Sequence, residues 1–216
     1  VKAGTKPLPD GCIYDSNLPF MVSKLKEMGL EIVMICRLRD TVDSVVSFYE
    51  EVSENNIDIV ISSGAVSAGR YDFINEGLAK VGAEIFFHKV QQKPGKPVLF
   101  GKLPDNVLVF GLPGNPVSTV VGLRFYVNRA VQRLLGEGPE TATSLPLLNE
   151  FNNDGGLTFF LKAALDRDSR GNLGVKILTG QESFEVSPLL SFYGWVILKP
   201  GEKKLSVGDK IPFYRR

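Results

Sequence analysis

Residues 107–122 have the sequence VLVFGLPGNPVSTVVG, in which an apolar run passes through a loop of glycine and proline into a second apolar run. The first run is short and rich in β-branched and aromatic residues, which favours a buried strand. Pro116 stands where proline is preferred, at the first position of a helix, and Asn115 can cap that helix. A strand followed by a loop and a helix is the repeating unit of α/β folds. The stretch therefore predicts an α/β domain.

Helix and strand signals alternate upstream of this stretch as well. One helix is expected to begin at Asp15 or Ser16 and to end at Gly29, and a second to begin after Thr41. Further helices are expected through residues 73–81 and from Pro116 to Leu135, and strands at residues 30–36, 57–61, 84–90, 98–101 and 107–112. Such alternation is typical of parallel strands joined by crossover helices, here over residues 1–137.

The last third of the chain has a different pattern. Residues 136–146 are rich in Gly, Pro, Thr and Ser, which indicates a linker. Short strand candidates then alternate with turns rich in Gly and Asp, at residues 158–165, 174–178, 194–198 and 210–214. We therefore expect a small all-β, barrel-like domain over residues 138–216.

The charge of the chain is almost balanced, with 25 Lys and Arg against 24 Asp and Glu in 216 residues. No long run of one sign occurs, which argues against a nucleic-acid or membrane surface. No apolar run approaches the ~18 residues of a membrane span. Cys12 and Cys36 lack metal-ligand spacing and a disulfide pattern, so a reducing, cytoplasmic environment is expected.

Three loops have the residue types that bind anions. The first, residues 62–69 (SSGAVSAG), lies between an expected strand and an expected helix. Gly64 and Gly69 permit close approach of the main chain, while Ser63 and Ser67 offer hydroxyl groups. In an open α/β sheet, ligands bind at the carboxyl ends of strands. An ordinary Gly-Ser turn explains the same residues equally well.

The second loop is Lys93-Pro94-Gly95-Lys96-Pro97, where two prolines stiffen a segment that carries two ammonium groups. That arrangement suits a dianion, although a solvated basic turn is the simpler interpretation.

The third loop is residues 111–118 (GLPGNPVS). Ser118 falls in the first turn of the helix, where free amides and the helix dipole favour an oxyanion, and simple helix capping is the alternative.

Two titratable residues lie near these loops. Asp72 follows the first loop at a helix start, where its carboxylate can bind Mg²⁺ on a phosphate, orient water or cap the helix; capping is the commoner role. His88, the only histidine, lies inside an expected strand, which favours packing or hydrogen bonding over catalysis.

In this order and spacing, the loops resemble those of the molybdopterin molybdenumtransferase family, which includes the E domain of gephyrin. The resemblance also covers Gly11-Cys12-Ile13-Tyr14-Asp15-Ser16-Asn17 and extends over residues 1–137. It implies a three-layer molybdopterin-binding-like domain, with the all-β region as the family's C-terminal domain. It also implies that the chain is a C-terminal fragment of a protein that forms a homodimer when complete.

The resemblance implies that adenylylated molybdopterin is bound, that its adenylate is cleaved in a Mg²⁺-dependent step, and that molybdate, a substrate, is inserted. Asp72 would be the essential catalytic carboxylate and the metal ligand. The molybdate-binding residues would be Lys93, Lys96, Pro97, Ser118 and Ser183. The nucleotide- and pterin-binding residues would be Ser63, Gly64, Ser67, Gly69, Gly114 and Asn115. Two ammonium groups and a hydroxyl can neutralise and desolvate a tetrahedral dianion.

The chain departs from the family pattern at several positions. Ala65 replaces a second glycine, Arg70 an acidic residue and Gly156 an arginine. Lys162 replaces another arginine only in part, because it lacks the planar fork. These departures leave a non-catalytic scaffold of the gephyrin type as an alternative function. A related molybdopterin adenylyltransferase is a second alternative, which residues 93–97 and the all-β region disfavour.

Overall fold

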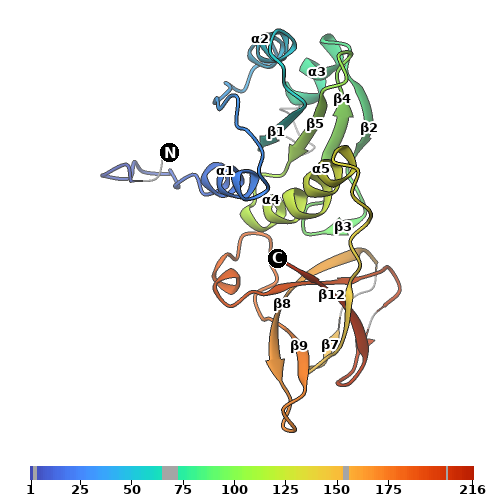
Figure 1. The fold of residues 1–216 in the computed structure, drawn as a ribbon. Helices are drawn as coiled ribbons and strands as arrows, with labels where there is room; N and C mark the ends of the chain where they lie inside the picture. Colours follow the sequence, from blue (N-terminus) through green and yellow to red (C-terminus); the bar gives the residue numbers. More distant parts are fainter. Residues whose placement is uncertain (2–3, 65–72, 153–155, 203) are drawn as a thin grey trace. The chain divides into compact units, whose positions relative to one another are not determined.

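The computed structural model describes residues 1, 4–64, 73–152, 156–202 and 204–216, which form two compact units (Figure 1). The first unit comprises Val1–His88 and Pro97–Thr119, and the second comprises Lys89–Lys96 and Val120–Arg216. The chain therefore passes between the units three times. The domain boundary expected at residue 137 stays a prediction.

The sheet of the first unit has four strands in the order β1-β5-β4-β2. These strands are β1 (Ile59–Ser63), β2 (Glu84–His88), β4 (Leu99–Lys102) and β5 (Leu108–Leu112). β1 and β5 are parallel, with Ser63 opposite Leu112, so both strands end at the same edge of the sheet. The other two pairings are antiparallel, so the expectation of a parallel sheet is correct only for β1 and β5. β4 and β5, both expected as strands, pair around a turn at Asn106, where φ is 67°.

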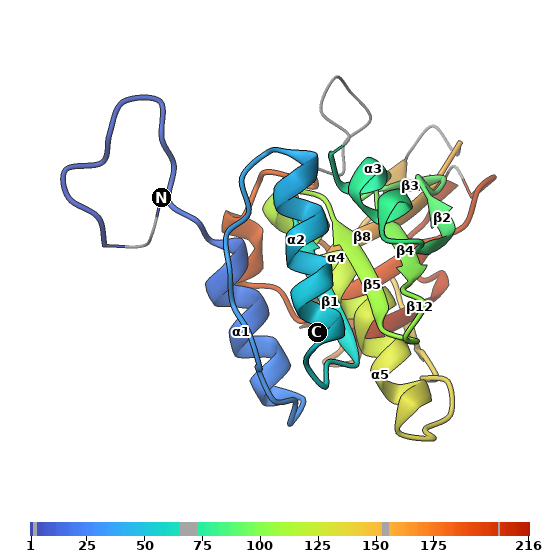
Figure 2. The ribbon, with the colours of Figure 1, turned by 90° about the horizontal axis from the view of Figure 1, so that it is seen from above.

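The helices of the first unit begin where the sequence predicts. α1 (Asn17–Glu27) is capped by Asp15, whose Oδ1 accepts a hydrogen bond from the Leu18 amide at 3.1 Å. α2 (Val42–Ser53) is capped in the same way by Thr41. α3 (Phe73–Lys80) and α2 pack on the sheet (Figure 2). Their shared core contains Val45, Tyr49, Val52, Val60, Ile74, Leu78, Leu99, Leu103, Val107 and Val109.

The strand expected at residues 30–36 is wrong. In the described part of the chain this segment has no strand partner, and β1 pairs with β5 alone. Val33 and Ile35 are each 54% exposed, so the apolar run does not become a buried strand. An apolar pattern provides side chains for a strand, but a strand also needs a neighbour for its backbone hydrogen bonds.

One long helical segment follows β5. It consists of α4 (Pro116–Gly122), a π-helical turn η1 (Leu123–Val127) and α5 (Asn128–Leu134), which follow one another without a break. The helix begins at Pro116 as predicted. The π-helical turn was not predicted, because a five-residue change of helical period has no clear sequence pattern.

The second unit is built on one curved sheet in the order β3-β8-β10-β12-β6, with β9 paired to β8. The strands are β3 (Gln92–Lys93), β6 (Thr143–Pro146), β8 (Thr158–Arg167), β9 (Leu173–Ile177), β10 (Gly194–Leu198) and β12 (Lys210–Arg215). A separate pair joins β7 (Phe151–Asn152) to β11 (Lys204–Leu205), and η2 (Ser187–Leu190) is a short 3₁₀ helix. All four strands predicted after residue 150 are present.

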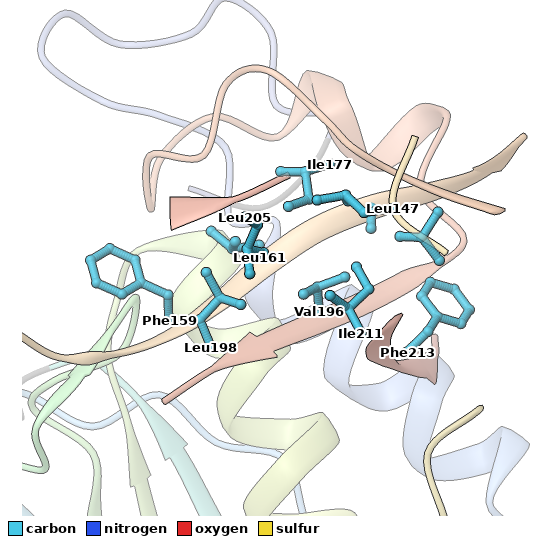
Figure 3. Packing of buried hydrophobic residues seen from close by; sticks show 11 residues of the cluster. Leu147, Phe159, Leu161, Ile177, Val196, Leu198, Leu205, Ile211 and Phe213 are labelled. Carbon is cyan, nitrogen blue, oxygen red and sulfur yellow. The ribbon is translucent and has the colours of Figure 1, made fainter. Parts of the chain in front are cut away.

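The buried side chains enclosed by this curved sheet are apolar (Figure 3). Leu147, Leu161, Val196 and Phe213 come from different segments and belong to one buried cluster. A single bridge between Leu147 and Val175 links the chain after β6 to β9, so the sheet curls back towards its own edge without a continuous closing ladder. This arrangement agrees with the expected barrel-like form.

The expected linker is shorter than predicted. Residues 143–146 form β6, which pairs with β12, so only the preceding residues connect the helix to the sheet. Short edge strands that contain proline are difficult to distinguish from linkers.

Within the described residues, none of the helices combines the length and apolar character that a membrane crossing requires.

Candidate functional site

A pocket of about 460 Å³ lies in the first unit where β1 and β5 end. Ser62, Ser63 and Gly64 line it from the end of β1, and Gly114 lines it from the loop after β5. Residues of α1 and residues 36–40 also line it, and apolar side chains of α2 and α3 complete its wall. We call this cavity the strand-end pocket. Its position is the one at which open α/β sheets bind ligands.

Asn17 ties together the two loops of the strand-end pocket. Its Nδ2 lies 2.8 Å from both the Gly114 carbonyl oxygen and Ser63 Oγ. A carbonyl oxygen can only accept, so the Gly114 contact establishes which end of the amide is the donor. Ser63 Oγ therefore accepts its hydrogen bond from Asn17.

The hydroxyl of Thr119 limits the directions in which the proton of Ser63 can point. Thr119 Oγ1 donates to the Pro113 carbonyl at 2.7 Å and lies 3.5 Å from Ser63 Oγ. Because the single proton of Thr119 is used in that bond, the Ser63 proton is directed towards Thr119 or into the pocket. The 3.5 Å contact is long, so Ser63 is a donor that a ligand oxygen can recruit.

The backbone conformation at Gly64, which lines the pocket, favours glycine. Gly64 has a φ of +93°, which other residues rarely adopt, and its amide donates to the Leu112 carbonyl at 3.0 Å. A Cβ at Gly114 would lie 3.6 Å from the Gly64 Cα, so the two loops approach closely. The buried Ser62 Oγ has no hydrogen-bond partner among the described residues, which leaves another hydroxyl for a ligand.

Charged residues of the pocket were not predicted as site residues. Arg37 forms an ion pair with Asp15 at 3.0 Å, and both line the pocket with Arg39 and Asp40. Sequence reasoning assigned Asp15 only a capping role and gave no role to Asn17 or to the arginines. The signal available was their position: Asn17 belongs to the motif shared with the family, and the arginines follow an apolar run.

Several predicted site residues lie outside the described residues. They are Ser67, Gly69 and Asp72, and the departures at Ala65 and Arg70 also lie outside the described residues. The expected metal ligand is therefore untested. Within the described ranges, no three His, Cys, Asp or Glu side chains come together as a metal site. His88 is placed, and its Nδ1 lies 3.0 Å from Asn75 Nδ2, which confirms the hydrogen-bonding role.

The second unit contains the loop of the two lysines, Lys93–Lys96, which we call the basic loop. Both lysine side chains are exposed, and Lys93 Nζ forms an ion pair with Glu182 Oε1 at 3.2 Å. The paired side chains are 45% and 52% exposed, so the ion pair is solvated and weak. The structure thus places Lys93 beside the turn that carries Ser183.

Lys162 forms hydrogen bonds to the main chain of that turn. It is fully buried, and its Nζ donates to the main-chain carbonyls of Glu182 and Glu185 at 3.3 and 3.0 Å. The Gln181 side chain accepts from the Lys162 amide and donates to its carbonyl. Burial lowers the pKa of Lys162, while the carboxylates of Glu185 and Glu182 oppose this shift. Lys162 therefore supports the turn and has its charge directed at main-chain oxygens.

The five residues predicted to bind molybdate belong to both units. Lys93, Lys96 and Ser183 are in the second unit, whereas Pro97 and the buried Ser118 are in the first. The molybdate pocket as a complete set stays a prediction.

A mixed sheet with a pocket at its strand ends, lined by polar and apolar residues, is typical of α/β ligand-binding proteins. Residues 3–133 match a family described as a probable molybdopterin binding domain, and the chain belongs to that family. The match includes the strand-end pocket, the basic loop and almost all of the long helix.

Individual relatives agree with this assignment. The chain is 29% identical over 202 residues to the molybdopterin molybdenumtransferase of Synechococcus elongatus, covering 93% of this chain and 49% of that protein. It is 32% identical over 166 residues to the Staphylococcus aureus protein of the same name, covering 76% and 39%. The resemblance to molybdenumtransferases inferred from the sequence is thereby confirmed. The chain spans half or less of the length of these relatives.

The fold also has a solved counterpart. The molybdopterin biosynthesis MoeA protein of Pyrococcus horikoshii aligns with a TM-score of 0.78 at 24% identity, covering all of this chain and 51% of that protein. At this identity the similarity concerns the fold. It confirms the expected combination of an α/β domain with a β domain.

Proposed function

We propose that this chain is part of a cytoplasmic enzyme of molybdenum cofactor biosynthesis, a molybdopterin molybdenumtransferase. The enzyme binds adenylylated molybdopterin, cleaves its phosphoanhydride to release AMP, and inserts molybdate into the dithiolene. The observation that carries the proposal is the strand-end pocket with its directed hydroxyl donor, in a chain of the molybdopterin-binding family. The complete protein acts as a homodimer.

The strand-end pocket receives the nucleotide and pterin. Ser63 donates to a phosphate oxygen, and the glycines allow the main chain to approach the ligand. The residues assigned to this role are Ser63, Gly64, Ser67, Gly69, Gly114 and Asn115. Arg37 and Arg39 line the same pocket and can donate to phosphate oxygens, while Asp15 and Asp40 balance their charge.

Molybdate binds to the basic loop with the help of hydroxyl groups. Lys93 and Lys96 supply two positive charges for a dianion, and the residues assigned with them are Pro97, Ser118 and Ser183. The contact between Lys93 and Glu182, on the turn that carries Ser183, supports grouping that turn with the lysines.

Asp72 is assigned the role of essential carboxylate and Mg²⁺ ligand. Mg²⁺ is commonly bound by one or two carboxylates together with substrate phosphates, which is the arrangement that this assignment requires. When bound, Mg²⁺ would polarise the phosphoanhydride. Asp72 would orient that reacting end of the ligand.

AMP release by the complete protein tests this proposal. Asp72→Asn preserves the shape of the side chain and removes its charge, so we expect folding to be retained and AMP release to be abolished. Asp105→Asn, in the exposed hairpin turn, is the matched control and should release AMP at the wild-type rate. Unchanged turnover in Asp72→Asn would exclude the catalytic role.

The same assay separates the alternatives. A non-catalytic scaffold, which the departures at Ala65, Arg70 and Gly156 favour, would bind the ligand and release no AMP. An adenylyltransferase would consume ATP and transfer adenylate to molybdopterin. A molybdenumtransferase releases AMP without ATP.

A further inference from the structure

Gln92 lies beneath the basic loop and holds its main chain. The residue is 4% exposed, whereas the lysines above it are exposed. Its Nε2 donates to the carbonyl oxygens of Pro94 at 3.0 Å and Gly95 at 3.3 Å. Because carbonyl oxygens only accept, the orientation of the Gln92 amide is determined. Both amide protons are directed at the loop.

Tyr126 completes the hydrogen bonds of Gln92. With its nitrogen facing the carbonyls, Gln92 presents Oε1 to Tyr126, whose hydroxyl donates to it. Tyr126 lies in the π-helical turn η1, and π-helical turns often occur at functional sites. Burial raises the pKa of Tyr126, which keeps the hydroxyl protonated and therefore a donor.

The ends of the basic loop are held as well. The Val90 amide donates to the Lys96 carbonyl at 2.8 Å, and β3 pairs with β8 at Gln92 and Lys93. Between these anchors Gly95 adopts a φ of 88°. The Gln92 amide therefore contacts the only part of the loop that the strand pairing leaves unsupported.

We propose that Gln92 and Tyr126 are positioning residues for oxyanion binding: together they hold the main chain of the basic loop so that Lys93 and Lys96 are aimed before the anion arrives. This inference rests on the proposed function. A preorganised loop binds more tightly because less conformational entropy is lost on binding. The two residues act through the loop, while the lysines contact the anion.

Molybdate-dependent turnover of the complete protein provides the first test. In Gln92→Met the lysine charges remain but the loop is released, so KM for molybdate should rise about ten-fold, as expected for two lost hydrogen bonds. The kcat at saturating molybdate should stay near the wild-type value, because the same contacts form once the anion is bound. Tyr126→Phe should raise KM about three-fold. A variant that was merely misfolded would lower kcat and leave KM unchanged.

Matched controls are available in the same unit. Gln91→Met changes the neighbouring exposed glutamine, and Tyr193→Phe removes the hydroxyl of a tyrosine that is 56% exposed. Both should have the wild-type KM. If Gln92→Met or Tyr126→Phe also kept the wild-type KM, the positioning role would be overturned.

A second measurement does not depend on molybdate. NMR order parameters of the Gly95 and Lys96 amides should fall from about 0.85 to below about 0.6 in Gln92→Met. Unchanged order parameters would overturn the inference even if the enzyme were active. Conversely, a wild-type protein without molybdate-dependent turnover would refute the proposed function, while the order parameters would still decide whether Gln92 holds the loop.

Discussion

The strand-end pocket and the basic loop present hydrogen-bond donors in different ways. In the pocket, the donor is the neutral hydroxyl of Ser63, directed by Asn17 and Thr119. In the basic loop, the donors are the charged and exposed side chains of Lys93 and Lys96, and the buried contacts hold only the main chain. Ligand binding in the pocket depends on the direction of hydrogen-bond donors, whereas anion binding at the basic loop depends on charge.

This difference predicts different sensitivities. The attraction between solvated charges and an anion is screened by salt. A neutral donor contributes less but depends on its orientation. Removing charge should therefore weaken ligand binding most at the basic loop. Reversing the direction of a hydrogen bond should weaken ligand binding most in the pocket.

The largest effect is expected when both lysines of the basic loop are replaced by methionine. Methionine keeps much of the apolar bulk, and two charged hydrogen bonds are lost, so molybdate affinity should fall by roughly two to four powers of ten. The free energy of unfolding should change little, because exposed lysines contribute little to stability. Calorimetry with molybdate checks this, and wild-type affinity in the double variant would show that the anion binds elsewhere.

A smaller effect is expected from Asn17→Asp in the strand-end pocket. The carboxylate cannot donate to Gly114 or Ser63, and it accepts the Ser63 proton that a phosphate would use. AMP affinity, measured by calorimetry, should fall by about ten-fold or more, and by only a few-fold in Asn17→Ala. The exposed Asn56→Asp adds the same charge to the same unit as a control. Equal losses in Asn17→Asp and Asn17→Ala would contradict the directed proton.

Glu182→Gln should strengthen molybdate binding, in contrast to the two preceding substitutions, which weaken binding. Its effect should be smaller than theirs. Glu182 competes with an anion for Lys93, and its removal leaves the ammonium without a carboxylate partner. Molybdate affinity should rise about two- to five-fold at low salt, the range expected for an exposed ion pair. Glu137→Gln, on an exposed residue of the same unit, should leave it unchanged. Weaker binding in Glu182→Gln would mean that the ion pair positions Lys93 and does not compete for it.

The smallest effect concerns pH and Lys162. Burial lowers its pKa in the folded state, so between that pKa and the ordinary value the unfolded chain binds more protons. Stability from this group therefore rises with pH across that alkaline window. Urea unfolding should show the wild type gaining stability relative to Lys162→Met as pH increases there. If the difference in free energy of unfolding between the wild type and Lys162→Met did not change with pH, a lowered pKa of Lys162 would be excluded.

Local features of the fold were predictable because their causes lie within a few residues. Asp15 and Thr41 each cap a helix by accepting a hydrogen bond from the amide three residues later, and the hairpin of β4 and β5 turns at Asn106. The strand expected at residues 30–36 failed because its formation depends on a partner elsewhere in the chain. The glycines and lysines of the loops were identified from their order, whereas the local signal for Arg37 and Arg39 was no more than their position after an apolar run.

The sequence by itself determined which segments are helical, which loops follow strands and which side chains could bind an anion, because periodicity, caps and turn residues act locally. Only the tertiary structure decided how those side chains are oriented. Asn17 reaches Ser63 and Gly114 across 46 and 97 residues, and Tyr126 reaches Gln92 across 34. Such contacts depend on how the chain packs, and the direction of each proton follows from which neighbours can only accept.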